Sequence, residues 1–448
     1  MLKRKIDLVL ERFHADPSRK ALLLTGARQV GKTFSVREFG KSHYDVFIEF
    51  NFIQNAEARS IFANVDDARD VLLRISALAA GQLLPGRTLI FIDEVQVCPE
   101  AVTFVKFLVE EGSYRYILSG SLLGVELKNI RSVPVGYMDE AQMFPLDFEE
   151  FVQANGIGDD VMGHLRDCAA EMRSPDPVIH GRMMRYHALY LITGGMPAVV
   201  QRYLDTNDLQ QVTSEQMAIV REYQRDVTQY DEKLHMKLKT IYLLIPSELN
   251  RHNKRFYIKN TSARGRFDRL EDDFVWLKEA GVAIPVFNVD EPKVPLELAR
   301  KANLFKLFLN DVGLLCSLYM DGIQLKILNG EMDINYGAVY ENFVAQELTA
   351  HGYDTVYYYS SKRRGEVDFL VESEGAVLPI EVKSGKDVTA HAALDNLMSE
   401  PSFAIPKAWV LSGKGDVLRQ GNVVHMPIYF LMFLERNRLE KPLIYRVE

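Results

Sequence analysis

The stretch ALLLTGARQVGKTFSVREF, residues 21–39, decides the fold of the first part of the chain. It reads as a short buried strand, a glycine loop and the start of a helix, with the P-loop spacing Gly-x-x-x-x-Gly-Lys-Thr. The two glycines allow backbone N–H groups to curl around phosphate oxygens at a helix N-terminus. Lys32 is expected to reach the β- and γ-phosphates of ATP, and Thr33 to bind Mg²⁺. The predicted nucleotide-binding residues are Gly26, Ala27, Arg28, Gln29, Val30, Gly31, Lys32, Thr33 and Phe34.

An acidic pair ends another continuous apolar run, in TLIFIDEVQ at residues 88–96. Runs of this kind are typical of buried parallel strands. Beside a P-loop, Asp93 is expected to hold Mg²⁺ through water, and Glu94 to polarise the attacking water. Taken alone, the two residues would read equally well as acids that merely end a strand.

A further apolar run, in YRYILSGSLLGVEL at residues 114–127, ends in Ser-Gly-Ser. In ATPases with an acidic pair after the metal-binding strand, a polar residue at this place senses the γ-phosphate. Ser119 and Ser121 are both candidates for this role. The alternative is that they are small residues that cap the strand, and both interpretations stay open.

Length and composition limit the classes of protein to consider. A chain of 448 residues suits two to four compact units, and 47% hydrophobic with 25% charged residues is ordinary for a folded protein. The net charge of −8 argues against broad coating of nucleic acid. Three widely spaced cysteines indicate a reducing, cytoplasmic compartment. The apolar stretch VVHMPIYFLMFL, residues 423–434, is too short to span a bilayer, so no membrane partner is expected.

Five segments appear in a specific order: the P-loop, FIDEVQ at 91–96, LSGSLL at 118–123, FPLDFEEF at 144–151 and ITGGMP at 192–197. Together they resemble the AAA-type P-loop ATPases of bacteria and archaea whose C-terminal half is a nuclease-like domain of unknown function. The resemblance implies an ATP-hydrolysing enzyme that uses Mg²⁺, and it allows for a homo-oligomer. One departure is Tyr137, which stands where members often carry an arginine; the nearest arginine is Arg131. An arginine that completes a neighbouring site is therefore not assigned.

The middle of the chain has a helical pattern from about residue 156 to 230, which the resemblance identifies as a lid that closes on nucleotide. Residues 231–300 then read as helices followed by a strand pair, which suits a winged-helix-like module. A basic cluster with interleaved aromatic residues lies inside it and is the candidate contact to the DNA backbone. The alternative is a solvated helix face. The candidate DNA-binding residues are Arg251, Lys254, Arg255, Lys259, Arg264 and Arg266.

The stretch RRGEVDFLVESEGAVLPIEVKSG, residues 363–385, predicts two strands joined at Glu374 and Gly375. A two-residue turn, the commonest length, would set Asp368 opposite Glu381. Lys383 would stand on the same face, because side chains alternate along a strand. Two carboxylates and a lysine are then expected to converge.

Such a cluster suits phosphodiester cleavage with a divalent metal. Asp368 and Glu381 would bind Mg²⁺, while Lys383 would orient water or stabilise developing charge. The pattern resembles the PD-(D/E)xK nuclease core, although Val367 replaces the usual proline. These nucleases often add a helical glutamate, and Glu341 in GAVYENFVAQEL is the candidate metal ligand. The alternatives are a surface ion pair, or a nuclease-like domain that binds a partner without cleavage.

The sequence thus predicts an α/β protein with four parts: a parallel-sheet P-loop ATPase core at 1–155, a helical lid at 156–230, a winged-helix-like module at 231–300 and a C-terminal α/β PD-(D/E)xK nuclease-like domain at 301–448. The expected function is an ATPase that couples its nucleotide state to a Mg²⁺-dependent DNA nuclease or a DNA-binding domain. The competing hypothesis is an ATP-dependent signalling or assembly switch.

Overall fold

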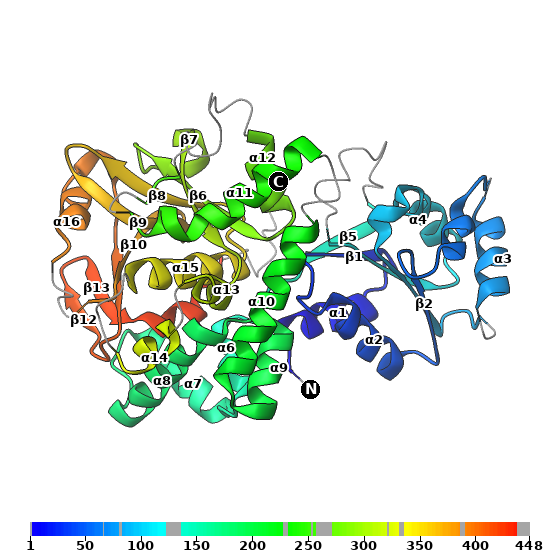
Figure 1. Ribbon diagram of the computed structural model, residues 1–448, viewed down its shortest axis with the longest axis horizontal. Coiled ribbons are helices and arrows are strands. Elements are labelled where there is room, and N and C mark those ends of the chain that lie inside the picture. The colour runs from blue at the N-terminus through cyan, green and yellow to red at the C-terminus, as the bar shows by residue number, and fades with distance from the viewer. Residues whose placement is uncertain are drawn as a thin grey trace, which may run out of the picture. The chain divides into compact units, whose positions relative to one another are not determined.

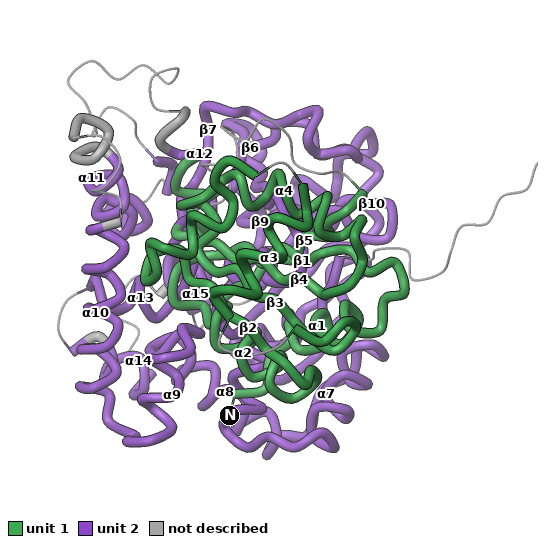
Figure 2. Tube along the Cα trace, turned by 90° about the vertical axis from the view of Figure 1, so that its right-hand side faces the viewer, with its two compact units in different colours: residues 1–144, 275–282 green, residues 145–274, 283–448 purple. Residues whose placement is uncertain are grey.

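The computed structural model describes ten segments of the chain (Figure 1), which are residues 2–65, 67–79, 83–121, 136–226, 232–251, 254–256, 271–319, 322–330, 336–385 and 390–436. The chain forms two compact units, coloured separately in Figure 2. The N-terminal unit comprises Met1–Phe144 and Val275–Val282, and the C-terminal unit comprises Pro145–Phe274 and Ala283–Glu448.

A five-stranded parallel sheet forms the centre of the N-terminal unit, as the apolar runs of the sequence predict. Its order is β2-β3-β4-β1-β5, so the P-loop strand β1 lies between β4 and β5. Strands β3 and β4 are buried along their whole length, whereas the edge strand β5 is largely exposed. The strands are β1 (Ala21–Thr25), β2 (Val46–Asn51), β3 (Thr88–Asp93), β4 (Arg115–Ser119) and β5 (Met138–Gln142).

Helices cover both faces of this sheet because its central strands have no polar face. On one side, Ile90 and Ile92 of β3 join a core with α3 and α4. On the other side, α2 passes so close to β2 that a Cβ at Gly40 would lie 2.3 Å from the Phe47 ring. The main helices are α1 (Lys5–Ala15), α2 (Lys32–His43), α3 (Ala68–Leu78) and α4 (Pro99–Glu111), with 3₁₀ turns η1 (Glu57–Phe62) and η2 (Val95–Val97).

The C-terminal unit begins with a long helical region. All regular structure described between residues 156 and 230 is helical, as predicted, while the role of this region as a lid stays a prediction. The helices of the whole helical region, which extends beyond this range at both ends, are α6 (Phe148–Ala154), α7 (Asp159–Glu171), α8 (Pro177–Thr193), α9 (Pro197–Thr206), α10 (Leu209–Asp226) and α11 (Glu232–Leu249). Among the described residues, no helix is both long enough and apolar enough to cross a membrane.

An eight-stranded mixed sheet, with the order β12-β13-β11-β10-β9-β8-β6-β7, forms the rest of this unit. Its strands are β6 (Ala283–Val289), β7 (Arg300–Leu309), β8 (Val356–Ser361), β9 (Gly365–Ser373), β10 (Ala376–Lys383), β11 (Ala408–Ser412), β12 (Leu418–Gln420) and β13 (Val423–Pro427). Helix α15 (Tyr336–Ala350) lies against β6, β7, β8 and β10. The other elements are α12 (Glu271–Glu279), α13 (Val312–Ser317), α14 (Ile323–Leu328), α16 (Ala392–Met398), η7 (Leu296–Ala299), η8 (Pro401–Phe403) and η9 (Ile428–Phe433).

The strand pair expected in a winged-helix-like module is present as β6 and β7. However, β6 also pairs in parallel with β8, so the pair forms one edge of the eight-stranded sheet. The boundary expected at residue 300 therefore falls inside this sheet, at the start of β7. Residues 252–253 and 257–270 lie outside the described residues, and the winged helix stays a prediction.

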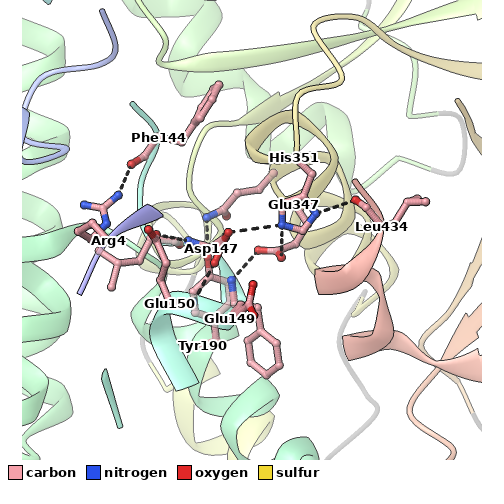
Figure 3. A network of polar contacts seen from close by, with 12 residues as sticks. Arg4, Phe144, Asp147, Glu149, Glu150, Tyr190, Glu347, His351 and Leu434 are labelled. Carbon is pink, nitrogen blue, oxygen red and sulfur yellow. Dashed lines mark hydrogen bonds and ion pairs between the residues drawn. The ribbon is translucent and has the colours of Figure 1, made fainter. Parts of the chain in front are cut away.

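The segment FPLDFEEF proves to be the capped start of α6 (Figure 3). Asp147 accepts a hydrogen bond from the Glu150 N–H at 2.8 Å, and Glu150 accepts one from the Asp147 N–H at 3.1 Å. This is a capping box, which satisfies the free N–H groups of a helix end. Glu347 of α15 accepts from the Phe148 N–H at 2.9 Å, and His351 lies 3.4 Å from Asp147. The acidic residues of this segment thus anchor α6 within the C-terminal unit.

The glycine pair of ITGGMP is explained by close backbone approach. Gly195 donates its N–H to Asp311 at 2.6 Å and accepts from the Leu146 N–H at 2.7 Å. A Cβ at Gly195 would lie only 1.9 Å from the Leu146 carbonyl oxygen. No side chain fits at this position without movement of the backbone.

We therefore expect Gly195→Ala to lower the free energy of unfolding by about 3 kcal/mol, because the new methyl group overpacks a rigid backbone contact. Gly163→Ala is the matched control: it lies within α7 and its Cβ meets no atom within 4 Å. That change should raise stability by about 0.5–1 kcal/mol. Urea unfolding followed by circular dichroism checks both, and equal midpoints for the two variants would contradict the packing argument.

Candidate active sites

The P-loop adopts a backbone conformation that its sequence was expected to allow. Gly26, Gln29 and Gly31 have φ of +135°, +64° and +98°, and α2 begins at Lys32 immediately afterwards. A Cβ at Gly26 would lie 2.2 Å from the Met143 carbonyl oxygen, so this glycine is required by space as well as by φ. The loop therefore presents backbone N–H groups at the N-terminus of a twelve-residue helix, as phosphate binding needs.

Lys32 lies folded over this loop. Its Nζ donates hydrogen bonds to the carbonyl oxygens of Gly26 and Ala27, both at 2.8 Å. Burial lowers the pKa of Lys32 to about 8, although the negative charges of Glu94 and Asp93 oppose the shift. The ammonium is therefore held where phosphate groups would arrive, in surroundings that desolvate it.

Asp93, at the end of β3, receives hydrogen bonds from three side chains on other elements. Thr33 Oγ1 donates to Asp93 Oδ2 at 2.9 Å, Asn51 Nδ2 donates to the same oxygen at 3.1 Å, and Ser119 Oγ donates to Oδ1. The two predicted Mg²⁺ ligands, Thr33 and Asp93, are thus adjacent. Ser119 contacts the carboxylate that is predicted to hold the metal, so its side chain has a polar partner beyond any role in capping the strand.

Glu94 has its own set of neighbours, and its backbone is in the left-handed region with φ of +60°. Gln96 Nε2 donates to Glu94 Oε2 at 2.5 Å, and Ser121 Oγ lies 3.5 Å from the same oxygen. Arg28 Nε is 3.4 Å from Ser121 Oγ. Ser119 and Ser121 therefore divide between the two acids, one beside Asp93 and one beside Glu94.

Two residues of this site were not predicted, namely Asn51 and Gln96. Asn51 ends β2 and pairs in register with Asp93 on β3. A polar residue at the end of a strand next to β3 was a usable signal, because the carboxyl ends of parallel strands meet at one edge of the sheet. Gln96 lies two residues after Glu94 and offered no comparable pattern.

Tyr137, at the position where an arginine is often found in the resembling family, contacts side chains of α4. Its hydroxyl donates to Glu110 Oε1 at 2.6 Å, and the Lys106 ammonium lies 5.5 Å from its ring centroid. Arg131 lies outside the described residues.

The C-terminal hairpin has the predicted two-residue turn. Glu374 and Gly375 have φ of +54° and +77°, and strands β9 and β10 pair from Ala376–Ser373 to Ile380–Phe369. Continuation of this register sets Glu381 beside Asp368, and Asp368 Oδ2 accepts from the Val382 N–H at 2.9 Å. Lys383 Nζ donates to Glu381 Oε1 at 2.8 Å. The hairpin thus brings these three side chains together.

Glu341 of α15 faces the same cluster, but lysines occupy both of its oxygens. Lys254 donates to Oε1, and Lys306 lies 3.4 Å from Oε2. Lys306 of β7 also lies 2.8 Å from Glu366 Oε1 and 4.0 Å from Asp368 Oδ1. Neither Lys306 nor Glu366 was predicted. A lysine within the buried apolar end of β7, and a second acid two residues before Asp368, were the available signals.

The pKa shifts in this cluster follow from burial and from the charges nearby. Burial raises the pKa of Asp368 well above its usual range, and the carboxylates of Glu381 and Glu341 add to the effect. Burial also raises the pKa of Glu381, against the opposing charge of Lys383. Although burial acts in the other direction, Lys306 and Lys254 hold the pKa of Glu341 below its usual value.

The residues fit a divalent metal only in part. Glu381 Oε2 is buried without a hydrogen-bond partner, which is the kind of oxygen that a metal ion would satisfy. Asp368 and Glu381 are adjacent and supply the hard oxygen ligands that Mg²⁺ prefers. Glu341, in contrast, is held by two ammonium groups. Within the described segments, no group of three or more His, Cys, Asp or Glu side chains is arranged to hold a metal ion.

Half of the expected DNA-binding cluster lies in the described residues, and these side chains contact acidic or polar groups of the C-terminal unit. Lys254 pairs with Glu341, and Arg255 donates to Ser360 Oγ at 2.6 Å. Arg251 lies 3.1 Å from Glu248. The remaining candidates, Lys259, Arg264 and Arg266, lie outside the described residues.

The lowered pKa of Lys32 gives ATP affinity a defined pH dependence. Bound phosphate favours the protonated amine, so affinity should fall by about tenfold per pH unit as pH rises above 8. Lys32→Arg should bind with an affinity that is flat over this range, because a guanidinium stays protonated. Titration with a fluorescent ATP analogue between pH 7 and 9 measures both slopes. Equal slopes for the two proteins would show that another group titrates.

Three family models match separate parts of the chain. Residues 18–152 match the AAA domain, residues 184–326 match a domain of unknown function, DUF8612, and residues 336–431 match a second one, DUF4143. No curated protein matches the chain.

Solved structures of low sequence identity also match. The Walker-type ATPase of Pyrococcus abyssi is 14% identical, with 71% of this chain and 96% of that chain covered and a TM-score of 0.42. The Orc1 protein of Aeropyrum pernix in complex with DNA is 13% identical, with 72% and 92% covered and a TM-score of 0.27. Cdc6 of Pyrobaculum aerophilum is 14% identical, with 73% and 93% covered and a TM-score of 0.25. The family match, the parallel sheet and the P-loop together identify residues 18–152 as an AAA-type P-loop ATPase domain.

Proposed function

We propose that the protein hydrolyses ATP and uses its nucleotide state to control the C-terminal nuclease-like domain, which acts on DNA. The observation that carries the proposal is the course of residues 275–282. They belong to the N-terminal compact unit, and the chain continues from them directly into β6 of the eight-stranded sheet. A change at the nucleotide site has a covalent route to that sheet.

The first half of the proposal rests on the roles of the nucleotide-site residues. Lys32 and the loop N–H groups would bind the phosphates, and Thr33 with Asp93 would hold Mg²⁺, which would neutralise phosphate charge. Glu94 would orient and polarise the attacking water. Gln96 and Ser121, which contact Glu94, would set the direction of its carboxylate.

The coupling rests on Gly281, in the turn between α12 and β6. This glycine has φ of +70°, and a Cβ there would lie 3.1 Å from the Ala27 backbone nitrogen of the P-loop. A movement of the loop backbone on phosphate binding would therefore press on this turn. Gly281 is followed within two residues by the first residue of β6.

DNA cleavage is the first candidate activity of the C-terminal domain. Asp368 and Glu381 would hold Mg²⁺, and Lys383 would orient water or stabilise charge on the phosphate. The unpartnered Glu381 Oε2 supports this form. Mg²⁺-dependent DNA cutting that is lost in Asp368→Ala and Lys383→Ala, with ATP turnover retained, would establish it.

A second candidate is an assembly or signalling switch in which the domain binds a partner without cleavage. The observation that favours it is the pairing of Glu341 with two lysines, which removes one of the three expected metal ligands. Position 137 holds a tyrosine where members of the resembling family often carry an arginine. The lack of that arginine is consistent with slow hydrolysis of ATP. A homo-oligomer that forms with ATP and dissociates with ADP, measured by light scattering, would support this form.

For ATP turnover, we expect Glu94→Gln to lower kcat by about 10²–10⁴-fold, because the water loses its polarising carboxylate, while ATP binding is retained. Lys32→Ala should weaken ATP binding as well. Glu57→Gln, an exposed residue of η1, is the matched control and should retain wild-type turnover. The measurement is the rate of phosphate release at saturating ATP. A kcat of Glu94→Gln equal to that of the wild type would contradict the role of Glu94 in polarising the attacking water.

For the coupling, we expect DNA affinity to differ between ADP and a non-hydrolysable ATP analogue in the wild type. In Gly281→Ala this difference should shrink, because the methyl group disturbs the contact with Ala27. The control is Gly322→Ala, which introduces the same positive-φ strain at +86° but meets no atom within 4 Å. Fluorescence anisotropy with labelled DNA measures all three proteins, and an unchanged difference in Gly281→Ala would contradict this route.

A further inference from the structure

Lys306 is unusual because it is a lysine with almost no exposure to solvent. Its side chain is 1% exposed, in the part of β7 where every residue is buried. An unpaired ammonium in such a place would cost several kcal/mol, so it needs compensating charges. The carboxylates of Glu341, Glu366 and Asp368 provide them, and the ring of Tyr358 lies 5.1 Å from Nζ.

The sheet geometry explains why these groups meet. Glu366 and Asp368 alternate with Val367 along β9, so both acids face one side while Val367 packs with α16 on the other. Lys306 projects from β7, and Glu341 projects from α15, which lies across β6, β7, β8 and β10. The ammonium of Lys306 is therefore held by two acids from strand β9 and by one from the helix that packs on the sheet.

The charges of this cluster are close to balance without any metal. Four carboxylates, from Glu341, Glu366, Asp368 and Glu381, face the ammonium groups of Lys254, Lys306 and Lys383. Both oxygens of Glu341 contact lysines, and Asp368 Oδ2 accepts a backbone hydrogen bond. A Mg²⁺ ion prefers about six oxygen ligands and would have to displace an ammonium from this arrangement.

We propose that Lys306 is the resident cation of this carboxylate cluster and takes the position that a divalent metal would otherwise occupy. The inference rests on the proposed function and selects its second form, in which the C-terminal domain binds its partner without metal-dependent cleavage. Lys306 then serves to neutralise and order Glu341, Glu366 and Asp368. Glu381 Oε2, which is buried without a hydrogen-bond partner, would supply one ligand, whereas a Mg²⁺ site needs several.

The test is Mn²⁺ binding, measured without nucleotide in an Asp93→Asn background so that the ATP site contributes no ion. Binding is followed by electron paramagnetic resonance, in which the signal of free Mn²⁺ decreases as the ion binds. We expect the protein with Lys306 intact to bind no Mn²⁺ at micromolar concentrations, so that this signal stays unchanged. Lys306→Met removes the ammonium and keeps the length of the side chain. Compared with the protein that has Lys306 intact, this variant should have a lower Tm and should gain one Mn²⁺ site with at least tenfold higher affinity. Its Tm should rise by several degrees when millimolar MnCl₂ is added.

Three controls identify the cause. Lys306→Met with Asp368→Asn should lose the new site, which locates the ion at the cluster. Lys306→Arg keeps the charge and should bind no Mn²⁺. Lys407→Met removes a surface lysine paired with Glu374 and should change neither Tm nor Mn²⁺ binding.

Two results would overturn the inference. One is micromolar Mn²⁺ binding with Lys306 intact that is lost in Asp368→Asn, a measurement that does not depend on the folding of Lys306→Met. The other is a folded Lys306→Met protein that gains no Mn²⁺ site. Either result leaves ATP turnover and nucleotide-dependent DNA affinity to be judged separately, so failure here is distinguishable from failure of the proposed function.

Discussion

The predicted nucleotide site depends on one constraint, which is that neighbouring parallel strands end at the same edge of a sheet. Strands β2, β3 and β4 end in Asn51, Asp93 and Ser119, and the P-loop leaves β1 beside them. Asp93 sits at the centre of this edge and accepts from Thr33, Asn51 and Ser119. Each of these residues is far from the others in the chain. The sheet order alone makes them neighbours and leaves Glu94, one residue further, at the rim of the same site.

A different constraint governs the C-terminal unit, where charged side chains are buried on one face of a mixed sheet. Breaking a buried ion pair by removing one partner costs roughly 3–5 kcal/mol, because the remaining charge has no water to solvate it. Lys306, Glu341, Glu366 and Asp368 therefore hold one another in place as a set. These acids therefore contribute to the stability of the unit, and their presence by itself does not establish cleavage.

The features that sequence reasoning recovered are those set by local geometry. The positive φ values of Gly26 and Gly31 follow from the glycine spacing, and the turn at Glu374 and Gly375 follows from the hairpin pattern. The two-residue turn also sets the register of β9 and β10, because the pairing of the two strands continues regularly from the turn. Residues whose role depends on distant partners were missed. The contact of Lys254 with Glu341, which is 87 residues away, was not foreseen, and its role as a DNA contact stays a prediction.

By itself, therefore, the sequence determined the P-loop, the acidic pair after β3, the parallel core and the acid–lysine hairpin. Each of these depends on spacing within a few residues and on the alternation of side chains along a strand. Only the tertiary structure decided that Asn51 contacts Asp93, that β6 and β7 join the C-terminal sheet, and that Lys306 lies among the carboxylates. The physical reason is that a buried charge takes its partners from whichever elements pack against it, and packing across a sheet is not encoded in any short stretch of chain.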